Sequence, residues 1–235
     1  MMKLDRPIRS RKIRTSLLFL CVLLFLALGG VQSLFAADGE GAIRFSWAFL
    51  YQGKDGTTRP IDYDRQVIRL ESGDKIKIYL KPLDACYIYL YLYDAQKDLF
   101  LLFPETFTRT DANPRFTENF ELPGVNSWYY LDDRLGTETF YLIVSARPLT
   151  DLEERTTQYF KRLANERKNR QLLTHKYGVL DEIKRLIKES SYLSEAAEKP
   201  VAVAGDFRGI REERDLNGVY VEAARVYVKT IRLAH

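Results

Sequence analysis

Alternating apolar and polar side chains mark residues 43–51 as the first strand-like segment of the chain. Every second residue there is large and apolar, while Arg44 and Ser46 occupy positions between them. Because successive side chains of a β-strand point to opposite faces, this period of two predicts a strand with one face in a core. The predicted core-facing residues are Ile43, Phe45, Trp47, Phe49 and Tyr51.

Two further segments, 75–81 and 86–93, repeat this alternation more regularly. In the first, lysines alternate with isoleucine and leucine directly after the turn sequence Ser72-Gly73-Asp74. In the second, tyrosines occupy one face, and Cys86 and aliphatic residues occupy the other. Both segments therefore predict strands.

Several shorter segments have the composition of strands. The sequence LFLLFPE is apolar enough to predict a central strand that ends at Pro104. The other short strand candidates are residues 66–70, 116–123, 127–131 and 139–146.

The period of the pattern changes to 3.6 after Pro148. Thr150 followed by Glu153 is a capping-box pattern, and the apolar stripe behind it predicts a helix. A second helix is predicted over 177–189, so the two helices form an appendage at about 150–190. Beyond Pro200 the composition is strand-like again, which predicts that the end of the chain rejoins the sheet.

This order of elements predicts a mainly β fold, an antiparallel β-sandwich with a two-helix insertion. We expect a single domain over residues 38–235, because no linker composition divides that stretch.

Residues 1–37 have the order of a secretory signal peptide. A basic start precedes an apolar run from Leu17 to Leu28, and small residues follow at Ala36 and Ala37. We therefore expect a periplasmic or secreted protein. The alternative is an uncleaved signal that anchors the chain in the inner membrane, facing the periplasm, because Leu34 and Phe35 are bulky for a cleavage site.

The signal segment also carries the basic charge of the chain. The whole sequence has 36 Lys and Arg against 32 Asp and Glu, and residues 1–37 contain six of those cations and one of those anions. The remainder is therefore close to neutral, which argues against a nucleic-acid partner. Its one cysteine, Cys86, cannot form an internal disulfide, so we expect it to be buried.

No catalytic or metal-binding motif is visible in the sequence. The two histidines, His175 and His235, are far apart, and no glycine-rich phosphate loop is present. We expect no cofactor and no metal. Glycosidase chemistry would require an acid pair, for which the candidates are Glu118 with Glu121 and Asp132 with Asp133.

The tyrosine face of residues 86–93 is the strongest candidate binding surface. Four phenols on one strand would form an aromatic platform for a glycan or a partner protein, flanked by Lys75 and Lys77 if the two strands pair. The interpretation that we favour over such a platform is that the tyrosines pack beneath the helical appendage, with their hydroxyls reaching water. The tyrosines concerned are Tyr87, Tyr89, Tyr91 and Tyr93.

Several of these segments together resemble one protein family. The sequences SGDKIKIYLKP, CYIYLYLYDAQKDLFLLFPE, FELPG and GTETFYLIVSARPL are similar to the bacterial domain of unknown function numbered 4384, over about residues 66–152. The resemblance implies an accessory module of envelope, signalling or protease proteins, and it implies no catalytic residues.

We therefore expect a non-enzymatic binding module of the bacterial cell envelope. Its partner would be another envelope protein or a surface or cell-wall ligand, with membrane contact only through an uncleaved signal. The alternatives are an envelope hydrolase with one of the acid pairs, and a structural subunit that assembles through its helices.

Overall fold

The structure is a computed structural model that describes residues 42–62, 67–105, 107, 116–165, 170–193, 197–203 and 216–235. They belong to a compact unit that spans residues 41–235. The predicted signal peptide, residues 1–37, lies outside the described residues.

The first sheet has seven strands, in the order β10-β11-β1-β4-β7, with β2 paired to β1 and β8 paired to β4. All its described pairings are antiparallel. The strands are β1 (Ile43–Gln52), β2 (Thr58–Pro60), β4 (Lys75–Pro82), β7 (Phe120–Leu122), β8 (Tyr129–Tyr130), β10 (Ala197–Val203) and β11 (Leu216–Ala223).

The second sheet has five strands, in the order β3-β12-β9-β5-β6. Its pairings are antiparallel except that β3 runs parallel to β12. The strands are β3 (Ile68–Arg69), β5 (Tyr87–Tyr93), β6 (Leu99–Phe103), β9 (Thr137–Ser145) and β12 (Val226–Ala234).

The main hydrophobic core lies between the two sheets. It contains Phe45 and Trp47 from β1 and Ile78 from β4, which meet Leu90 and Leu142 from the second sheet. Cys86 is a reduced thiol that is fully buried in this core, as predicted. Since each strand contributes alternate residues to this core, the period of two in the sequence is explained by the two-sheet packing.

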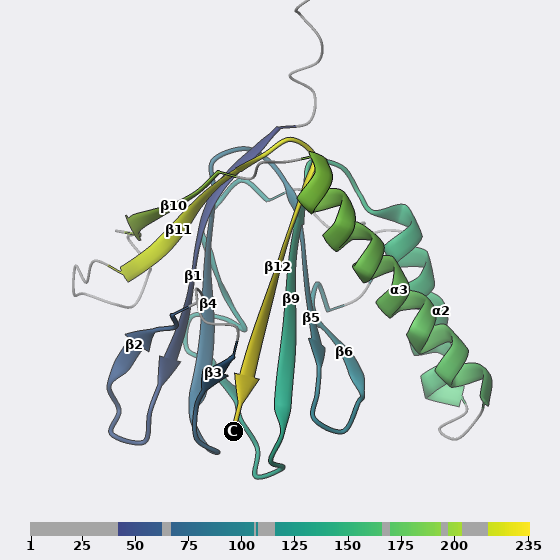
Figure 1. Ribbon diagram of the computed structural model, residues 1–235, viewed down its shortest axis with the longest axis horizontal. Coiled ribbons are helices and arrows are strands. Elements are labelled where there is room, and N and C mark those ends of the chain that lie inside the picture. The colour runs from purple at the N-terminus through teal and green to yellow at the C-terminus, as the bar shows by residue number, and fades with distance from the viewer. Residues whose placement is uncertain are drawn as a thin grey trace, which may run out of the picture. The chain divides into compact units, whose positions relative to one another are not determined.

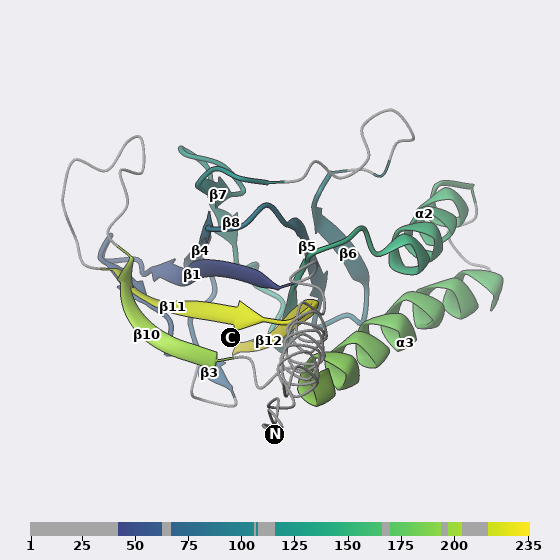
Figure 2. The ribbon, with the colours of Figure 1, turned by 90° about the horizontal axis from the view of Figure 1, so that it is seen from above.

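Two helices cover the outer face of the second sheet, α2 (Thr150–Asn165) and α3 (Arg170–Leu193). Figure 1 shows both helices beside β5, β6, β9 and β12, and Figure 2 shows the same layering from above. A second hydrophobic core fills the space between the helices and the second sheet. It contains Tyr89, Ile143, Leu152 and Ile183. None of the helices in the described part of the chain is long and apolar enough to cross a membrane.

The mainly β sandwich with a two-helix insertion is therefore confirmed. The second helix is longer than the predicted 177–189, since it begins at Arg170. The prediction of a central strand at LFLLF is wrong, because β6 lies at an edge of its sheet. The apolar composition of β6 has another cause, because both of its faces contact a hydrophobic core. Leu99 packs in the second core, beneath the helices, and Leu102 packs against the main core between the sheets.

Candidate functional site

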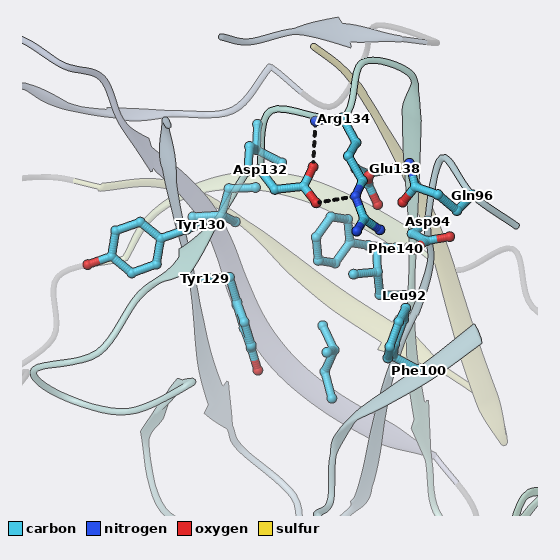
Figure 3. Close-up of a pocket in the computed structure, with 13 residues that line it drawn as sticks. Leu92, Asp94, Gln96, Phe100, Tyr129, Tyr130, Asp132, Arg134, Glu138 and Phe140 are labelled. Carbon is cyan, nitrogen blue, oxygen red and sulfur yellow. Dashed lines mark hydrogen bonds and ion pairs between the residues drawn. The ribbon is translucent and has the colours of Figure 1, made fainter. Parts of the chain in front are cut away.

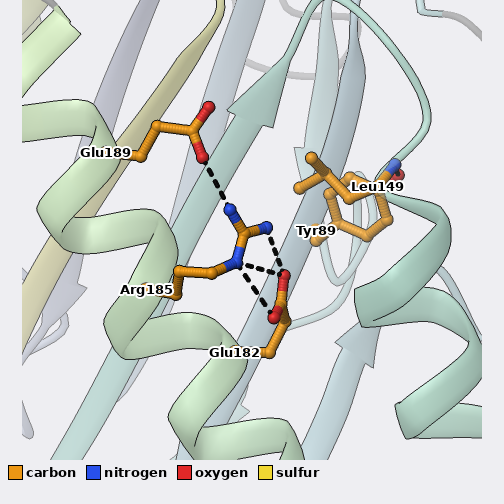
Figure 4. Close-up of polar contacts among 5 residues, drawn as sticks. All are labelled: Tyr89, Leu149, Glu182, Arg185 and Glu189. Carbon is orange, nitrogen blue, oxygen red and sulfur yellow. Dashed lines mark hydrogen bonds and ion pairs between the residues drawn. The ribbon is translucent and has the colours of Figure 1, made fainter.

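The structure places the tyrosine face of β5 beneath the helices. Tyr89 and Tyr91 are fully buried. The Tyr89 hydroxyl accepts a hydrogen bond from the backbone N–H of Leu149 (2.9 Å), just before α2, and donates one to Glu153 Oε1 (2.6 Å) in the first turn of α2. These contacts attach the start of α2 to the sheet. Figure 4 shows Tyr89 beside Leu149. Tyr89 and Tyr91 therefore do not form an open platform, and they pack beneath the helices as the favoured interpretation predicts.

The hydroxyl of Tyr91 follows the same pattern. Tyr91 pairs with Thr156 Oγ1 of α2 at 2.8 Å, and burial raises the pKa of Tyr91 well above its usual value. Tyr87 and Tyr93 are partly buried against the same core. The expectation that the hydroxyls reach water is thus wrong for Tyr89 and Tyr91, because α2 supplies hydrogen-bond partners for both.

Lys75 and Lys77 do not flank the tyrosines, because β4 and β5 lie in different sheets. Lys77 is buried on the outer face of the first sheet. Its ammonium lies 2.8 Å from Glu121 Oε2 and 2.6 Å from the carbonyl oxygen of Val125, below the ring of Trp128 at 4.9 Å. Glu121 is consequently held in a buried ion pair and is not available as half of a solvent-facing acid pair with Glu118.

An open cleft lies at one end of the sandwich, between the two sheets. Its volume is about 300 Å³, at the lower end of the range for small-ligand sites. One wall comes from β4 and β8, and the other from β5, β6 and β9. The apolar side chains of these walls are Ile76, Leu92, Phe100, Leu102, Tyr129 and Phe140.

Polar side chains gather at one end of the cleft. Figure 3 shows Asp132, Arg134 and Glu138 together with Asp94 and Gln96 above the apolar walls. The lining therefore includes three carboxylates and one guanidinium. Arg134 lies 3.8 Å from Asp132, and both side chains are more than half exposed, so this pair is weak.

Two turns build this polar end. Asp94 closes the β5–β6 turn by accepting the backbone N–H of Asp98 at 2.6 Å. Asp132 accepts the N–H of Arg134 at 2.9 Å and so shapes the loop before β9. The two turns meet at Gly136, where any side chain would collide with Ala95. A glycine is therefore required for this close approach.

Glu138 is the most unusual residue of the cleft, because this acidic residue is only 6% exposed. One oxygen accepts the backbone N–H of Ala95 at 3.3 Å and lies 3.5 Å from His235 Nε2. The other oxygen, Oε2, is buried with no hydrogen-bond partner among the described residues. Desolvation raises the pKa of Glu138 above its usual value.

Two of the aromatic side chains that line the cleft are exposed. Phe100 is 42% exposed and Tyr130 is 66% exposed, and both belong to the lining. Leu135, in the same loop as Asp132 and Arg134, is 78% exposed. Lys75 lies over the ring of Tyr130 at 5.6 Å, which places one further cation at this rim. Burial raises the pKa of Tyr129 to about 12, so its phenol is protonated at neutral pH.

A second depression, of about 480 Å³, lies beside the β1–β2 hairpin. Its charged side chains are largely paired with each other, since Arg59 contacts Asp55 at 2.6 Å and Lys54 contacts Glu71 at 3.3 Å. It has few apolar side chains. It is consequently a weaker candidate than the end cleft.

The sequence offered only a partial signal for the end cleft. Asp132 was considered as half of an acid pair, but the structure uses its carboxylate to shape a loop and contact Arg134. Asp94, Arg134 and Glu138 were not identified. Their position at strand ends was the available signal, but it required knowing that Tyr93 of β5 pairs with Thr139 of β9.

The geometry defines a class of protein, a two-sheet β-sandwich with a helical layer and an end cleft of mixed apolar and acidic character. Residues 69–148 match the family model described as a domain of unknown function (DUF4384), which confirms the resemblance predicted from the sequence. All residues that line the cleft fall within this segment, whereas α2, α3 and β10 to β12 follow it. Comparisons with curated proteins and with solved structures found no match.

Proposed function

We propose that this protein is an exported, non-enzymatic binding module of the bacterial cell envelope, and that it binds its partner at the end cleft. One observation carries the proposal. The cleft at the end of the sandwich is open and has apolar walls, and Asp94, Arg134 and Glu138 bring polar groups together at one end of it. Binding sites typically combine apolar walls with a few convergent polar groups of this kind.

The position of the carboxylates favours binding over hydrolysis. Glycosidase chemistry needs two carboxyl groups that face the same bond from opposite sides. Glu121 is neutralised by Lys77 in a buried pair, and Asp132 accepts a backbone N–H and contacts Arg134. Neither group is therefore disposed to act as the acid or base of such a pair.

Export is part of the same proposal. The basic and apolar order of residues 1–37 supports a periplasmic or secreted location, with an inner-membrane anchor facing the periplasm as the alternative. A buried Cys86 is compatible with an oxidising compartment, because a thiol out of contact with solvent is protected from oxidation.

Site-specific photo-crosslinking in living cells tests this proposal. A photoreactive phenylalanine analogue is introduced at Phe100 in the cleft wall, or at Leu83 as a control. The two residues have similar exposure, 42% and 50%, but Leu83 follows the end of β4 that lies away from Ile76 and the cleft. We expect a partner adduct from position 100 and none from position 83. Equal adducts from both positions, or none from position 100, would contradict the proposal.

Assembly through the helices is the second candidate, and one observation favours it. Leu173 and Tyr177 lie one turn apart on α3, and each is about half exposed. A self-associating α3 would make the sedimentation coefficient depend on concentration, and Leu173→Lys with Tyr177→Lys would abolish that dependence. A monomer at all concentrations would reject this candidate.

A further inference from the structure

We infer that Lys176 of α3 clamps the β5–β6 turn, residues 94–98, and thereby couples the helical layer to the end cleft. The turn contributes residues to the cleft, whereas none of the described lining residues belongs to α2 or α3. The clamp therefore lets the helices act on a site that they do not line. The part of this inference that concerns binding rests on the proposed function.

Lys176 is a charged residue in a buried position. It is only 8% exposed, although it carries an ammonium group at the end of a long side chain. The ammonium donates a hydrogen bond to the backbone carbonyl oxygen of Lys97 at 2.6 Å and lies 3.8 Å from Asp98 Oδ1. Because the Asp98 side chain is 63% exposed, the ion pair is weak and the carbonyl is the main partner. A buried charge is costly without partners, so these contacts hold Lys176 at the turn.

The turn has a backbone conformation that needs support. Lys97 is in the left-handed region, with a φ of 68°, which favours glycine over residues with a side chain. Within the turn, the N–H of Lys97 donates to the carbonyl oxygen of Asp94 at 3.0 Å, and the N–H of Asp98 donates to Asp94 Oδ1 at 2.6 Å. Lys176 adds a contact from another element, at the carbonyl group of the unfavourable residue itself.

The same turn forms one side of the polar end of the cleft. Asp94 and Gln96 line the cleft, and Figure 3 shows both at its polar end. Ala95, between them, lies against Gly136 and donates its backbone N–H to Glu138 Oε1 at 3.3 Å. A shift of the turn would therefore move two lining residues and disturb the loop before β9.

The clamp joins two different parts of the chain. All described lining residues lie within residues 69–148, the segment that matches the family model, whereas Lys176 lies beyond it. A free-energy coupling between two sites is reciprocal. Displacement of α3 should therefore loosen the turn, and an occupant that fixes the turn should strengthen the attachment of α3.

Lys176→Met tests the clamp, because methionine keeps an apolar stem and removes the ammonium. Amide hydrogen exchange and chemical shifts of the isotope-labelled protein are measured by NMR. We expect the amides of Lys97 and Asp98 to exchange about tenfold or more faster than in wild type. Resonances of Gln96 and Gly136 should also shift, although Lys176 contacts neither residue.

Three further variants separate the clamp from general packing. Lys184→Met is the matched control, because Lys184 is an exposed lysine of the same helix that pairs with Asp181, and it should change neither measurement. Lys176→Arg retains a charged donor and should restore most of the protection. Lys97→Gly, combined with Lys176→Met, should slow the exchange again, because glycine adopts the positive φ without support. Lys176→Gln, which is neutral and shorter, serves as the second variant if Lys176→Met does not fold.

The effect on binding is measured by photo-crosslinking from the opposite wall of the cleft. A photoreactive analogue at Tyr130 should give a severalfold lower yield of partner adduct in Lys176→Met than in Lys184→Met. Equal yields, or unchanged resonances of Gln96 and Gly136 in Lys176→Met, would overturn the coupling. Absence of any adduct in wild type would instead contradict the proposed function, and the resonances would still decide whether α3 acts on the cleft.

Discussion

The tyrosine face of β5 and the end cleft are both rich in aromatic side chains, but they differ in what covers them. On the tyrosine face, α2 and α3 bury Tyr89 and Tyr91, and α2 supplies partners for both hydroxyls. At the end cleft, Phe100 and Tyr130 remain exposed, and Glu138 Oε2 has no hydrogen-bond partner within the described residues. Aromatic content alone therefore does not distinguish a core from an open surface, whereas the exposure of the side chains and the pairing of their polar atoms do.

The largest expected effect is on the covered face. Tyr91→Ala should lower the free energy of unfolding by about 3–5 kcal/mol, because it leaves a cavity beneath α2 and removes the contact with Thr156. Urea unfolding followed by circular dichroism measures this. The exposed Tyr130→Ala is the control, with a change of about 0.5 kcal/mol or less. Similar losses from both variants would remove the contrast between the two regions.

The hydroxyl of Tyr89 should have an intermediate effect. Tyr89→Phe removes the acceptor for the N–H of Leu149 and the donor to Glu153, at a cost of about 1–3 kcal/mol. Amide hydrogen exchange should also become faster in the first turn of α2. Tyr87→Phe, on the same strand face, is the matched control. An unchanged exchange rate in α2 would show that Tyr89 does not fasten the helix.

A smaller change in stability is expected from Phe100 in the cleft. Since this side chain is 42% exposed, Phe100→Ser should lower the free energy of unfolding by about 1 kcal/mol. The yield of the partner adduct from a photoreactive analogue at Tyr130, in the same cleft, should nevertheless fall severalfold. This combination is the reverse of that expected for Tyr91→Ala, which leaves the cleft intact. If Phe100→Ser gave the adduct in normal yield, the cleft wall would have no role in recognition.

The smallest expected effect is a change in pH dependence. Because desolvation raises the pKa of Glu138 in the folded state, the folded chain binds its proton more readily than the unfolded chain. This stabilising contribution is complete below the usual pKa of 4.5 and is lost as the pH rises through the folded-state pKa. Glu138→Gln should therefore gain stability relative to wild type as the pH rises above 4.5. Parallel curves of Tm against pH for the two proteins would contradict a raised pKa.

The sequence predicted the strands and helices well because each has a local period. The alternation at 43–51 and 86–93 and the 3.6 period after Thr150 report directly on which faces are buried. These periods do not show which element of the fold covers each buried face. The tyrosine face of β5 has the same pattern whether water or α2 lies above it, so its covering could not be predicted from that segment.

The cleft was harder to predict because it has no local pattern. It depends on β8, a strand of two residues, and on two turns that meet only when Gly136 approaches Ala95. The burial of Glu138 depends further on His235, which reaches it from the far end of β12. These contacts join distant parts of the sequence, so only the folded arrangement of both sheets reveals them.

The buried pair of Lys77 and Glu121 also determines how the short strand β7 aligns with β4. Only three residues of β7 pair with β4, so backbone hydrogen bonds alone hold that alignment weakly. Slippage of β7 by one residue would turn Glu121 toward the apolar core and leave Lys77 without its counter-charge. An unpaired buried charge costs about 3–5 kcal/mol. The ion pair should therefore disfavour the misaligned arrangement and fix the register of β7 against β4.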